Sequence, residues 1–239
     1  MGTIMFVEEL SRGLSALGIP YSGQQLETCR AFFELLLEWN KKSNLTAITD
    51  ESEAVNKHFM DSLLPLAFGL LKPHAQCIDI GAGAGFPCVP LAIFREDIVF
   101  AALDSVRKKV EFVDYAAGAL GLSNVTALWG RAEDLGRQEN HRAQYDIVLN
   151  RALAPMNTLL EYSIPFLKVK GRVLSYKGPG VNEELTMAKN ALNKLSARVV
   201  GCHQKQFGGM TRHIVEIEKE SPTLPVYPRR AGQPKKQPL

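Results

Sequence analysis

One stretch of the sequence decides the fold: Cys77-Ile78-Asp79-Ile80-Gly81-Ala82-Gly83-Ala84-Gly85-Phe86-Pro87. An apolar run that includes an acid is followed by glycine at every second position, then by a proline and a second apolar run. This order predicts a buried strand, a tight turn and the start of a helix near Pro87. Alternating glycines let the backbone turn sharply and lie close to a ligand. The stretch therefore predicts a loop that binds a nucleotide cofactor.

The spacing of the glycines separates three classes of cofactor loop. A P-loop ends in Gly-Lys-Ser/Thr, whereas Gly85 is followed by Phe86 and Pro87, so that class is excluded. A dinucleotide loop needs its third glycine where this chain has Phe86. The observed G-x-G-x-G, preceded by Asp79, is similar to motif I of the class I methyltransferases that use S-adenosylmethionine (SAM). A tight turn that binds no ligand is the alternative interpretation.

The composition is that of an ordinary globular protein. The chain has 239 residues, 46% hydrophobic and 22% charged, with a formal net charge of only +3. Any affinity for nucleic acid must therefore come from local patches. We expect no signal peptide, no membrane span and no metal site, and four scattered cysteines that stay reduced in the cytoplasm.

The order of the elements predicts the architecture. Residues 1–72 read as a small helical extension, 73–220 as the main domain and 221–239 as a basic, proline-rich tail. Helices are expected near Pro87, Ser105, Pro155 and Val181, between strands at 77–80, 98–103, 125–129, 145–149, 171–176, 199–206 and 213–217. This alternation predicts a doubly wound, mostly parallel α/β sheet of the Rossmann-like class I SAM-methyltransferase type. The short Gly208-Gly209 connection makes the last two strands a hairpin with an antiparallel final strand.

Ligands of open α/β sheets lie over the carboxyl ends of the strands, so the residues there are the candidates for the site. Asp104 ends the second strand and can accept hydrogen bonds from a ribose diol, although a helix N-cap is its alternative role. After the third strand, Ala132 and Glu133 lie in the turn expected against adenine. The predicted cofactor-binding set is Asp79, Gly81, Gly83, Gly85, Phe86, Asp104, Ala132, Glu133 and Arg151.

Asn150 and Arg151 follow the fourth strand, at the catalytic position of this fold. The Asn/Asp-Pro-Pro-aromatic motif that orients an exocyclic amine is absent, and no cysteine nucleophile lies near Arg151. A ring nitrogen such as guanine N7 fits this chemistry because its lone pair is available without a general base. Catalysis would then rest on alignment, with Asn150 and Arg151 as the candidate residues.

The sequence resembles the ribosomal small-subunit methyltransferase G family, also called glucose-inhibited division protein B, over nearly its whole length. The motifs that carry this resemblance are Asn44-Leu45-Thr46, His58-Phe59-Met60-Asp61-Ser62, Asp79 to Leu91, Leu103-Asp104-Ser105, Arg131-Ala132-Glu133, Asn150-Arg151-Ala152, Tyr176-Lys177-Gly178 and Tyr227-Pro228-Arg229-Arg230-Ala231-Gly232. The resemblance implies SAM-dependent N7 methylation of one guanine in 16S rRNA near the decoding region. It also implies that Gly81, Phe86, Ala132, Glu133 and Arg151 contact SAM, and it departs at Cys88, where the family usually has glycine.

Basic residues near strand ends and in the tail are the candidates for rRNA phosphate contacts: Arg131, Lys177, Arg212, Arg229, Arg230, Lys235 and Lys236. His58 and Asp61 are interpreted as a pair on a helix surface, with a role in shaping the cleft by resemblance. The expected partner is 16S rRNA in the small ribosomal subunit, bound by a monomer. A non-catalytic RNA-binding module with a relic SAM site and a nicotinamide-dependent oxidoreductase remain as alternatives.

Overall fold

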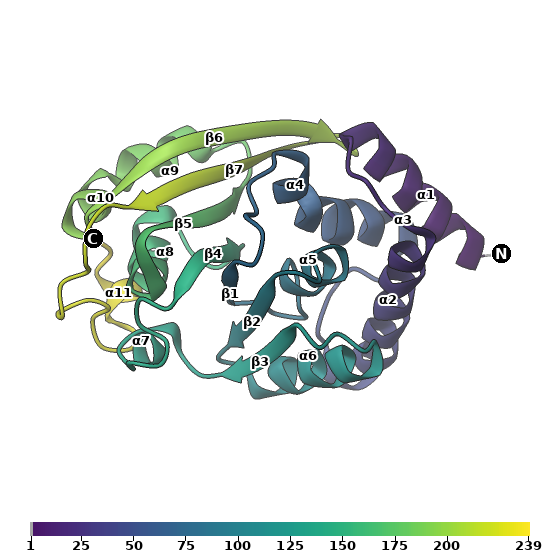
Figure 1. Ribbon diagram of the computed structural model, residues 1–239, viewed down its shortest axis with the longest axis horizontal. Helices are drawn as coiled ribbons and strands as arrows, with labels where there is room; N and C mark the ends of the chain where they lie inside the picture. The colour runs from purple at the N-terminus through teal and green to yellow at the C-terminus, as the bar shows by residue number, and fades with distance from the viewer. Residues whose placement is uncertain (1) are drawn as a thin grey trace.

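The computed structural model describes residues 2–239 and contains one seven-stranded sheet of order β3-β2-β1-β4-β5-β7-β6 (Figure 1). The strands are β1 (Gln76–Ile80), β2 (Val99–Asp104), β3 (Val125–Trp129), β4 (Tyr145–Arg151), β5 (Leu167–Lys177), β6 (Ala197–Phe207) and β7 (Met210–Lys219). Neighbouring strands from β3 to β5 are parallel, whereas β7 is antiparallel to both β5 and β6. The predicted α/β class, the doubly wound sheet and the antiparallel hairpin are therefore confirmed.

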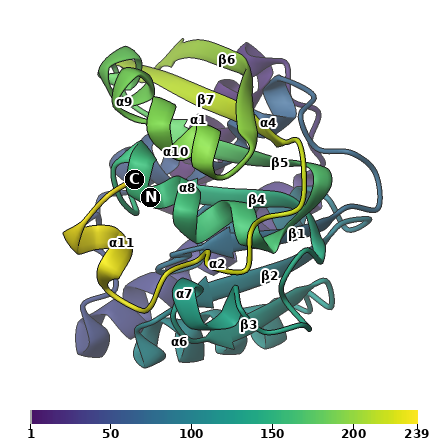
Figure 2. The ribbon, with the colours of Figure 1, turned by 90° about the vertical axis from the view of Figure 1, so that its left-hand side faces the viewer.

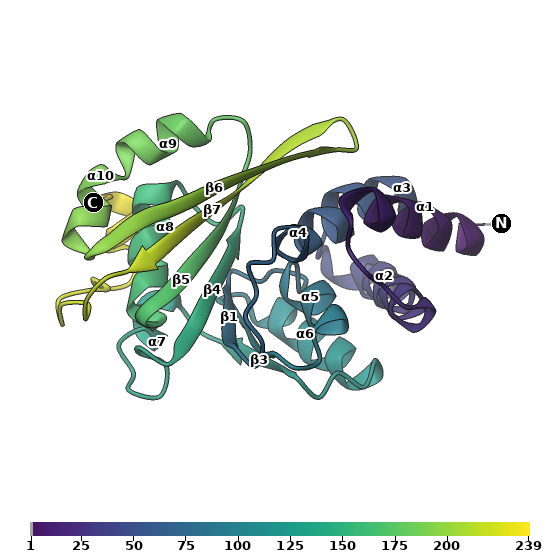
Figure 3. The same cartoon turned by 45° about the horizontal axis from the view of Figure 1, so that its top comes forward.

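Each face of the sheet is covered by helices because the central strands are apolar on both sides. In β1, Cys77 contributes to one hydrophobic core, whereas Ile78 and Ile80 contribute to the other. The first core is covered by α1 (Gly2–Leu17), α2 (Gly23–Ser43), α5 (Cys88–Phe94) and α6 (Arg107–Ala119). The second is covered by α8 (Met156–Ser163), α9 (Val181–Met187) and α10 (Lys189–Lys194), on the other side of the strands (Figure 3). Short elements α7 (Ala132–Leu135), η2 (Ile164–Phe166) and α11 (Gln233–Lys236) complete the chain.

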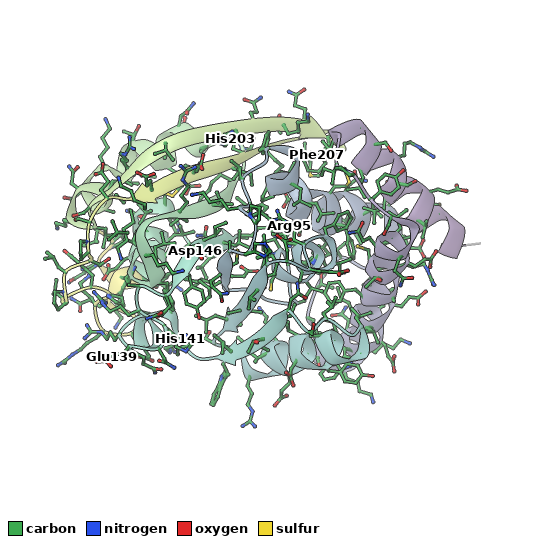
Figure 4. All side chains as sticks on the ribbon, in the orientation of Figure 1. Arg95, Glu139, His141, Asp146, His203 and Phe207 are labelled. Atoms are coloured by element: carbon green, nitrogen blue, oxygen red, sulfur yellow. The ribbon has the colours of Figure 1, made fainter. Side chains whose placement is uncertain are left out.

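The N-terminal helices share one core with the cofactor domain. Phe32 of α2 lies 5.2 Å from the ring of Phe86 and 5.9 Å from Phe112 of α6, measured between ring centroids. Phe207, at the end of β6, packs on the same core and lies close to the N-terminal helices (Figure 4). Within residues 2–72, the helices therefore form part of the helical layer on one face of the sheet.

The last helical stretch of the predicted extension is divided into three parts. These are α3 (Glu51–Ala54), the π-helical turn η1 (Val55–Met60) and α4 (Asp61–Ala67). Asp50 caps the first part by accepting a hydrogen bond from the Glu53 N–H over 2.8 Å. A π-helical turn often marks a functional position, and this one carries His58, three residues before Asp61.

The C-terminal segment is folded onto the domain beside α7 and α8 (Figure 2). Arg142 donates hydrogen bonds to the carbonyl oxygens of Thr223, Leu224 and Tyr227 at 2.7–3.2 Å. Pro228, Pro234 and Leu239 are buried. Within residues 2–239, no helix is both long and apolar enough to cross a membrane.

Gly85 gives a direct test of this packing. It has φ +87°, and an added Cβ would lie 2.7 Å from Val89 Cγ2 and 3.3 Å from Phe32 Cζ. We expect Gly85→Ala to lower the free energy of unfolding by about 2–4 kcal/mol, measured by urea denaturation, because strain and overpacking add. Gly69→Ala is the matched control, since its φ is +64° and nothing lies within 4 Å of an added Cβ. Equal losses in the two variants would contradict the packing role.

Candidate active site

A cavity of about 730 Å³ lies at the carboxyl ends of β4 and β5, which is a size typical of ligand sites. Its charged and polar lining combines residues from the N-terminal helices, the sheet and α9: Lys57, His58, Asp61, Arg151, Tyr176, Lys177, Glu184 and Arg212. Leu153 also lines the cavity and lies so close to Gly81 that an added Cβ there would be 2.7 Å from Leu153 Cδ1. The cavity therefore borders the glycine loop.

Arg151 joins the sheet to the N-terminal helices. It is the last residue of β4, and its Nη1 donates to the Lys57 carbonyl oxygen over 2.8 Å and to Asp61 Oδ2 over 3.1 Å. Its guanidinium also lies 5.6 Å from the Phe86 ring centroid. Asp61 is only 4% exposed and lies 3.2 Å from Arg212 Nε through its other oxygen. One buried carboxylate thus holds two arginines at the cavity.

His58 is held as a neutral ring between these groups. Burial, together with the charge of Arg151, lowers the pKa of His58 to about 4. Its Nδ1 lies 3.4 Å from Arg151 Nη2, which can only donate, so Nδ1 accepts and Nε2 donates to Thr46 Oγ1 over 3.0 Å. The ring stacks on Phe86 at 4.4 Å between centroids. His58 is therefore a wall of the cavity that carries no charge at neutral pH.

Thr46 reaches His58 because Asn40 fixes the turn that contains it. Asn40 Oδ1 accepts the N–H groups of Leu45 and Thr46 at 2.6 and 3.0 Å, and Asn40 Nδ2 donates to the Thr46 carbonyl oxygen. The Asn44-Leu45-Thr46 motif thus helps to position His58, which lines the cavity.

Two buried carboxylates organise the glycine loop. Asp104 Oδ2 accepts the Gly83 N–H over 3.0 Å, and its Oδ1 accepts the Val106 N–H over 2.8 Å. Asp79 lies beneath the loop, fully buried, and accepts the Cys88 N–H over 3.1 Å. Asp79 Oδ1 is buried without a hydrogen-bond partner among the described residues. Burial raises the pKa of Asp79 to about 7, with a further rise from Asp104, whereas the Cys88 N–H and Arg151 lower it.

This charge arrangement fits SAM. A loop backed by two carboxylates suits the sulfonium and ammonium groups, and Arg151 suits the carboxylate of the methionine part. An added Cβ at Gly83 would have only the Gly81 carbonyl oxygen nearby, at 3.9 Å, so the loop is open there for a ligand. Each Asp104 oxygen retains a second lone pair for a ribose hydroxyl.

Several predicted cofactor residues support the site without facing it. Asp79 is buried below the loop, Gly85 is required by packing, and the Phe86 ring, 5% exposed, belongs to the aromatic core. Glu133 is 6% exposed, and its Oε1 accepts the Gly232 N–H over 2.8 Å. The turn predicted to face adenine is therefore tied to the C-terminal segment.

The catalytic role of Asn150 stays a prediction, and the structure places this residue away from the cavity. The fourth strand continues two residues further than expected, so Asn150 and Arg151 belong to β4 and point to opposite faces. Asn150 is fully buried, and its Nδ2 donates to Ser163 Oγ of α8 over 3.3 Å. It does not line the cavity.

Two predicted RNA contacts are already paired within the protein. Arg229 forms a bidentate ion pair with Glu161, which is fully buried, and its backbone N–H also donates to Glu161. Lys177 pairs with Glu184 over 2.7 Å, and its side chain is 8% exposed. Arg131, Arg230, Lys235 and Lys236 are exposed and remain predictions. His58 and Asp61 do not lie on an exposed helix surface: both line the cavity, which agrees with the cleft-shaping role that the resemblance implies.

The raised pKa of Asp79 predicts a pH-dependent stability. From pH 3.8 to about pH 7 the folded protein keeps a proton that the unfolded chain releases, so ionisable Asp79 stabilises the fold less as pH rises. Asp79→Asn removes the titrating carboxyl group, and with it this pH dependence of stability, but keeps an oxygen that can accept the Cys88 N–H. We expect the free energy of unfolding of Asp79→Asn, relative to wild type, to rise from pH 4 to pH 7 and then level off, measured in urea. The lowered pKa of His58 makes stability rise with pH, but it does so equally in wild type and Asp79→Asn, so it cancels in the comparison. A difference in unfolding free energy that does not change with pH would show that the pKa of Asp79 is not raised.

The Arg229–Glu161 pair predicts a structural role for the C-terminal segment. Arg229→Ala leaves a buried carboxylate without its counter-ion, so we expect a loss of about 3–5 kcal/mol in the free energy of unfolding. Exposed Arg230 is the matched control, and Arg230→Ala should change stability by less than about 0.5 kcal/mol. Thermal and urea unfolding measure the stability of both variants. A stability of Arg229→Ala similar to that of Arg230→Ala would show that the Arg229–Glu161 pair is not structural.

Comparison with solved structures identifies the fold. The M. jannaschii TYW2 structure in complex with AdoMet aligns with a TM-score of 0.54 at 14% identity, over 72% of this chain and 79% of that one. A SAM-dependent methyltransferase from Aquifex aeolicus aligns with a TM-score of 0.54 at 20% identity, over 74% and 97%. At these identities, the likeness establishes the class I methyltransferase fold alone.

Comparison of sequences identifies the family. Residues 25–215 match the GidB family model, described as rRNA small subunit methyltransferase G. The Ribosomal RNA small subunit methyltransferase G of Moorella thermoacetica is 45% identical over 93% of each chain. Its namesakes from Streptococcus thermophilus and Lactococcus lactis subsp. cremoris are 44% and 43% identical, each over 98% of this chain and 100% of the relative. The chain therefore belongs to the rRNA small subunit methyltransferase G family.

Proposed function

We propose that this protein transfers the methyl group of SAM to N7 of a guanine in 16S rRNA, acting as a monomer on the small ribosomal subunit in the cytoplasm. The observation that carries the proposal is that Arg151, paired with Asp61, lines a cavity of about 730 Å³ that borders the glycine loop. Family membership supplies the reaction class and the cofactor. The choice of N7 as the methylated atom follows from the family, and the chemistry of the cavity supports it.

The residues that line the cavity support a ring nitrogen as the methyl acceptor. None of its lining residues is a cysteine, and Cys88 is fully buried with a pKa well above its usual range because of burial. His58 is neutral, but both of its nitrogens are engaged by Arg151 and Thr46. The lone pair of N7 needs neither a nucleophile nor a base. SAM supplies the electrophilic methyl group, and the protein supplies alignment.

The charged residues of the cavity have distinct proposed roles. Arg151 positions the acceptor and the cofactor carboxylate, and Asp61 holds Arg151 in place. Glu184, with its side chain 29% exposed at the cavity, can accept hydrogen bonds from the donors on the Watson–Crick edge of guanine. Lys177 fixes Glu184 for this contact, because its Nζ donates to Glu184 Oε2 over 2.7 Å.

Methyl transfer to unmodified small ribosomal subunits tests the proposal. Subunits are incubated with protein and methyl-labelled SAM, and the rRNA is digested and analysed for 7-methylguanosine by mass spectrometry. We expect label in 7-methylguanosine at a single site. Label in another nucleoside would overturn the N7 assignment, and no label in either intact subunits or free 16S rRNA would favour a non-catalytic binding protein.

The same assay tests Arg151. We expect Arg151→Ala to reduce the rate at least about 100-fold because the acceptor and cofactor lose their common anchor. Arg151→Lys should retain part of the rate, since an ammonium can pair with Asp61 but lacks the forked geometry. Arg12→Ala, an exposed residue of α1, is the control. Wild-type turnover by Arg151→Ala would remove Arg151 from the mechanism.

A further inference from the structure

An exposed tryptophan stands at the edge of the sheet. Trp129 is the last residue of β3, the edge strand beside α6 (Figure 1), and it is 61% exposed. The guanidinium of Arg107 lies 5.5 Å from its ring centroid, and the Arg107 side chain is itself 72% exposed. The indole N–H donates to the Ser105 carbonyl oxygen over 3.2 Å, which fixes the ring orientation. An aromatic ring held in solvent in this way offers a face to a ligand.

Basic residues lie at the ends of two helices near this edge, and one of them, Arg107, contacts the ring. Arg107, Lys108 and Lys109 form the first turn of α6, and Lys41 and Lys42 lie in the last turn of α2. Lys108 Nζ donates to the Ser43 carbonyl oxygen over 2.5 Å, so the two turns are in contact. Residues 38–43 and 104–111 together hold five basic and three acidic residues, and one of the acids, Asp104, is buried. Basic side chains oppose the dipole at a helix start, so local helix stability does not account for those in α6.

This surface adjoins the cofactor loop. Ser105, which accepts the Trp129 indole N–H, directly follows Asp104, and Asp104 accepts the Gly83 N–H. The Trp129 ring is therefore linked to the glycine loop through two consecutive residues, Asp104 and Ser105, each of which makes one of these hydrogen bonds. Arg107 also pairs with Glu111 over 3.0 Å, an exposed contact that contributes little and can be exchanged for a phosphate.

We propose that the Trp129 platform, made of Trp129, Arg107, Lys108, Lys109, Lys41 and Lys42, binds rRNA nucleotides that flank the methylated guanine. An unpaired base stacks on the exposed indole face, and the cations contact the neighbouring phosphates. This combination of aromatic stacking with a basic surface is the mode by which proteins hold single-stranded RNA. The identity of the RNA rests on the proposed function, whereas the platform itself rests on the contacts above.

Fluorescence tests whether a base stacks on the ring. The chain has two tryptophans, and Trp39 lies 5.6 Å from Phe112 and 5.3 Å from Tyr115 between ring centroids. Trp39→Phe keeps an aromatic ring there and leaves Trp129 as the sole tryptophan. We expect a 16S rRNA fragment that contains the target loop to quench this emission saturably. Binding of the fragment without any change in emission would overturn the stacking contact.

Affinity and salt dependence test the energetics. We expect Trp129→Ala to weaken binding of the fragment about 5- to 100-fold, and Trp129→Phe to keep most of the affinity, because stacking but not the indole hydrogen bond is required. Arg107→Gln with Lys109→Gln should flatten the plot of log K against log salt by about 0.7 for each lost contact. Lys194→Gln, an exposed residue of α10, is the control. Unchanged affinity and slope in these variants would refute the platform.

Two further readouts separate this proposal from other causes. SAM affinity, measured by calorimetry, should stay unchanged in Trp129→Ala; a matching loss of SAM affinity would assign the ring to the cofactor site instead. Wild-type methylation of subunits is measured in parallel. If the platform variants methylate subunits at the wild-type rate at subsaturating RNA, the RNA-binding role of the platform is refuted and the proposed function is unaffected. If the wild-type protein does not methylate subunits, the result counts against the proposed function.

Discussion

The glycine loop keeps its shape because two buried carboxylates accept hydrogen bonds from its backbone and from the helix that follows. Asp104 accepts from Gly83 and Val106, and Asp79 accepts from Cys88. Both acids lie at the carboxyl end of parallel strands that the two cores hold in register. Burial of a carboxylate is unfavourable unless charge compensates it, so this end of the sheet is prepared for a cationic ligand. The rest of the site is arranged around that loop.

The second constraint connects the sheet to the N-terminal helices. Arg151 pairs with Asp61 beside the neutral ring of His58, and the Phe86 ring packs between the loop and these helices. The cavity wall therefore comes from residues 48–61 as well as from the strands. The C-terminal segment contributes from the opposite side, because Glu133 and Glu161 bind it next to the turn after β3. The site depends on both ends of the chain.

Local patterns are sufficient to predict the strands, the helices between them and the antiparallel hairpin, because glycine turns and apolar runs are short-range signals. The positions of side chains across elements were not predictable in the same way. Asn150 lies away from the cavity because β4 continues through Arg151, and neighbouring residues of a strand face opposite sides of the sheet. His58 and Asp61 reach the cavity through a π-helical turn that the helical periodicity does not reveal. Arg229 finds its partner Glu161 at a separation of 68 residues, which a charge count in the tail cannot show.

Calorimetric titration of the purified protein with SAM, S-adenosylhomocysteine and NAD tests the central claim, that the loop held by Asp79 and Asp104 binds a sulfonium cofactor rather than a dinucleotide. The account predicts saturable binding of SAM and S-adenosylhomocysteine at one site per chain and no binding of NAD. Binding of NAD alone, or no binding of SAM in the presence of the rRNA substrate, would contradict it.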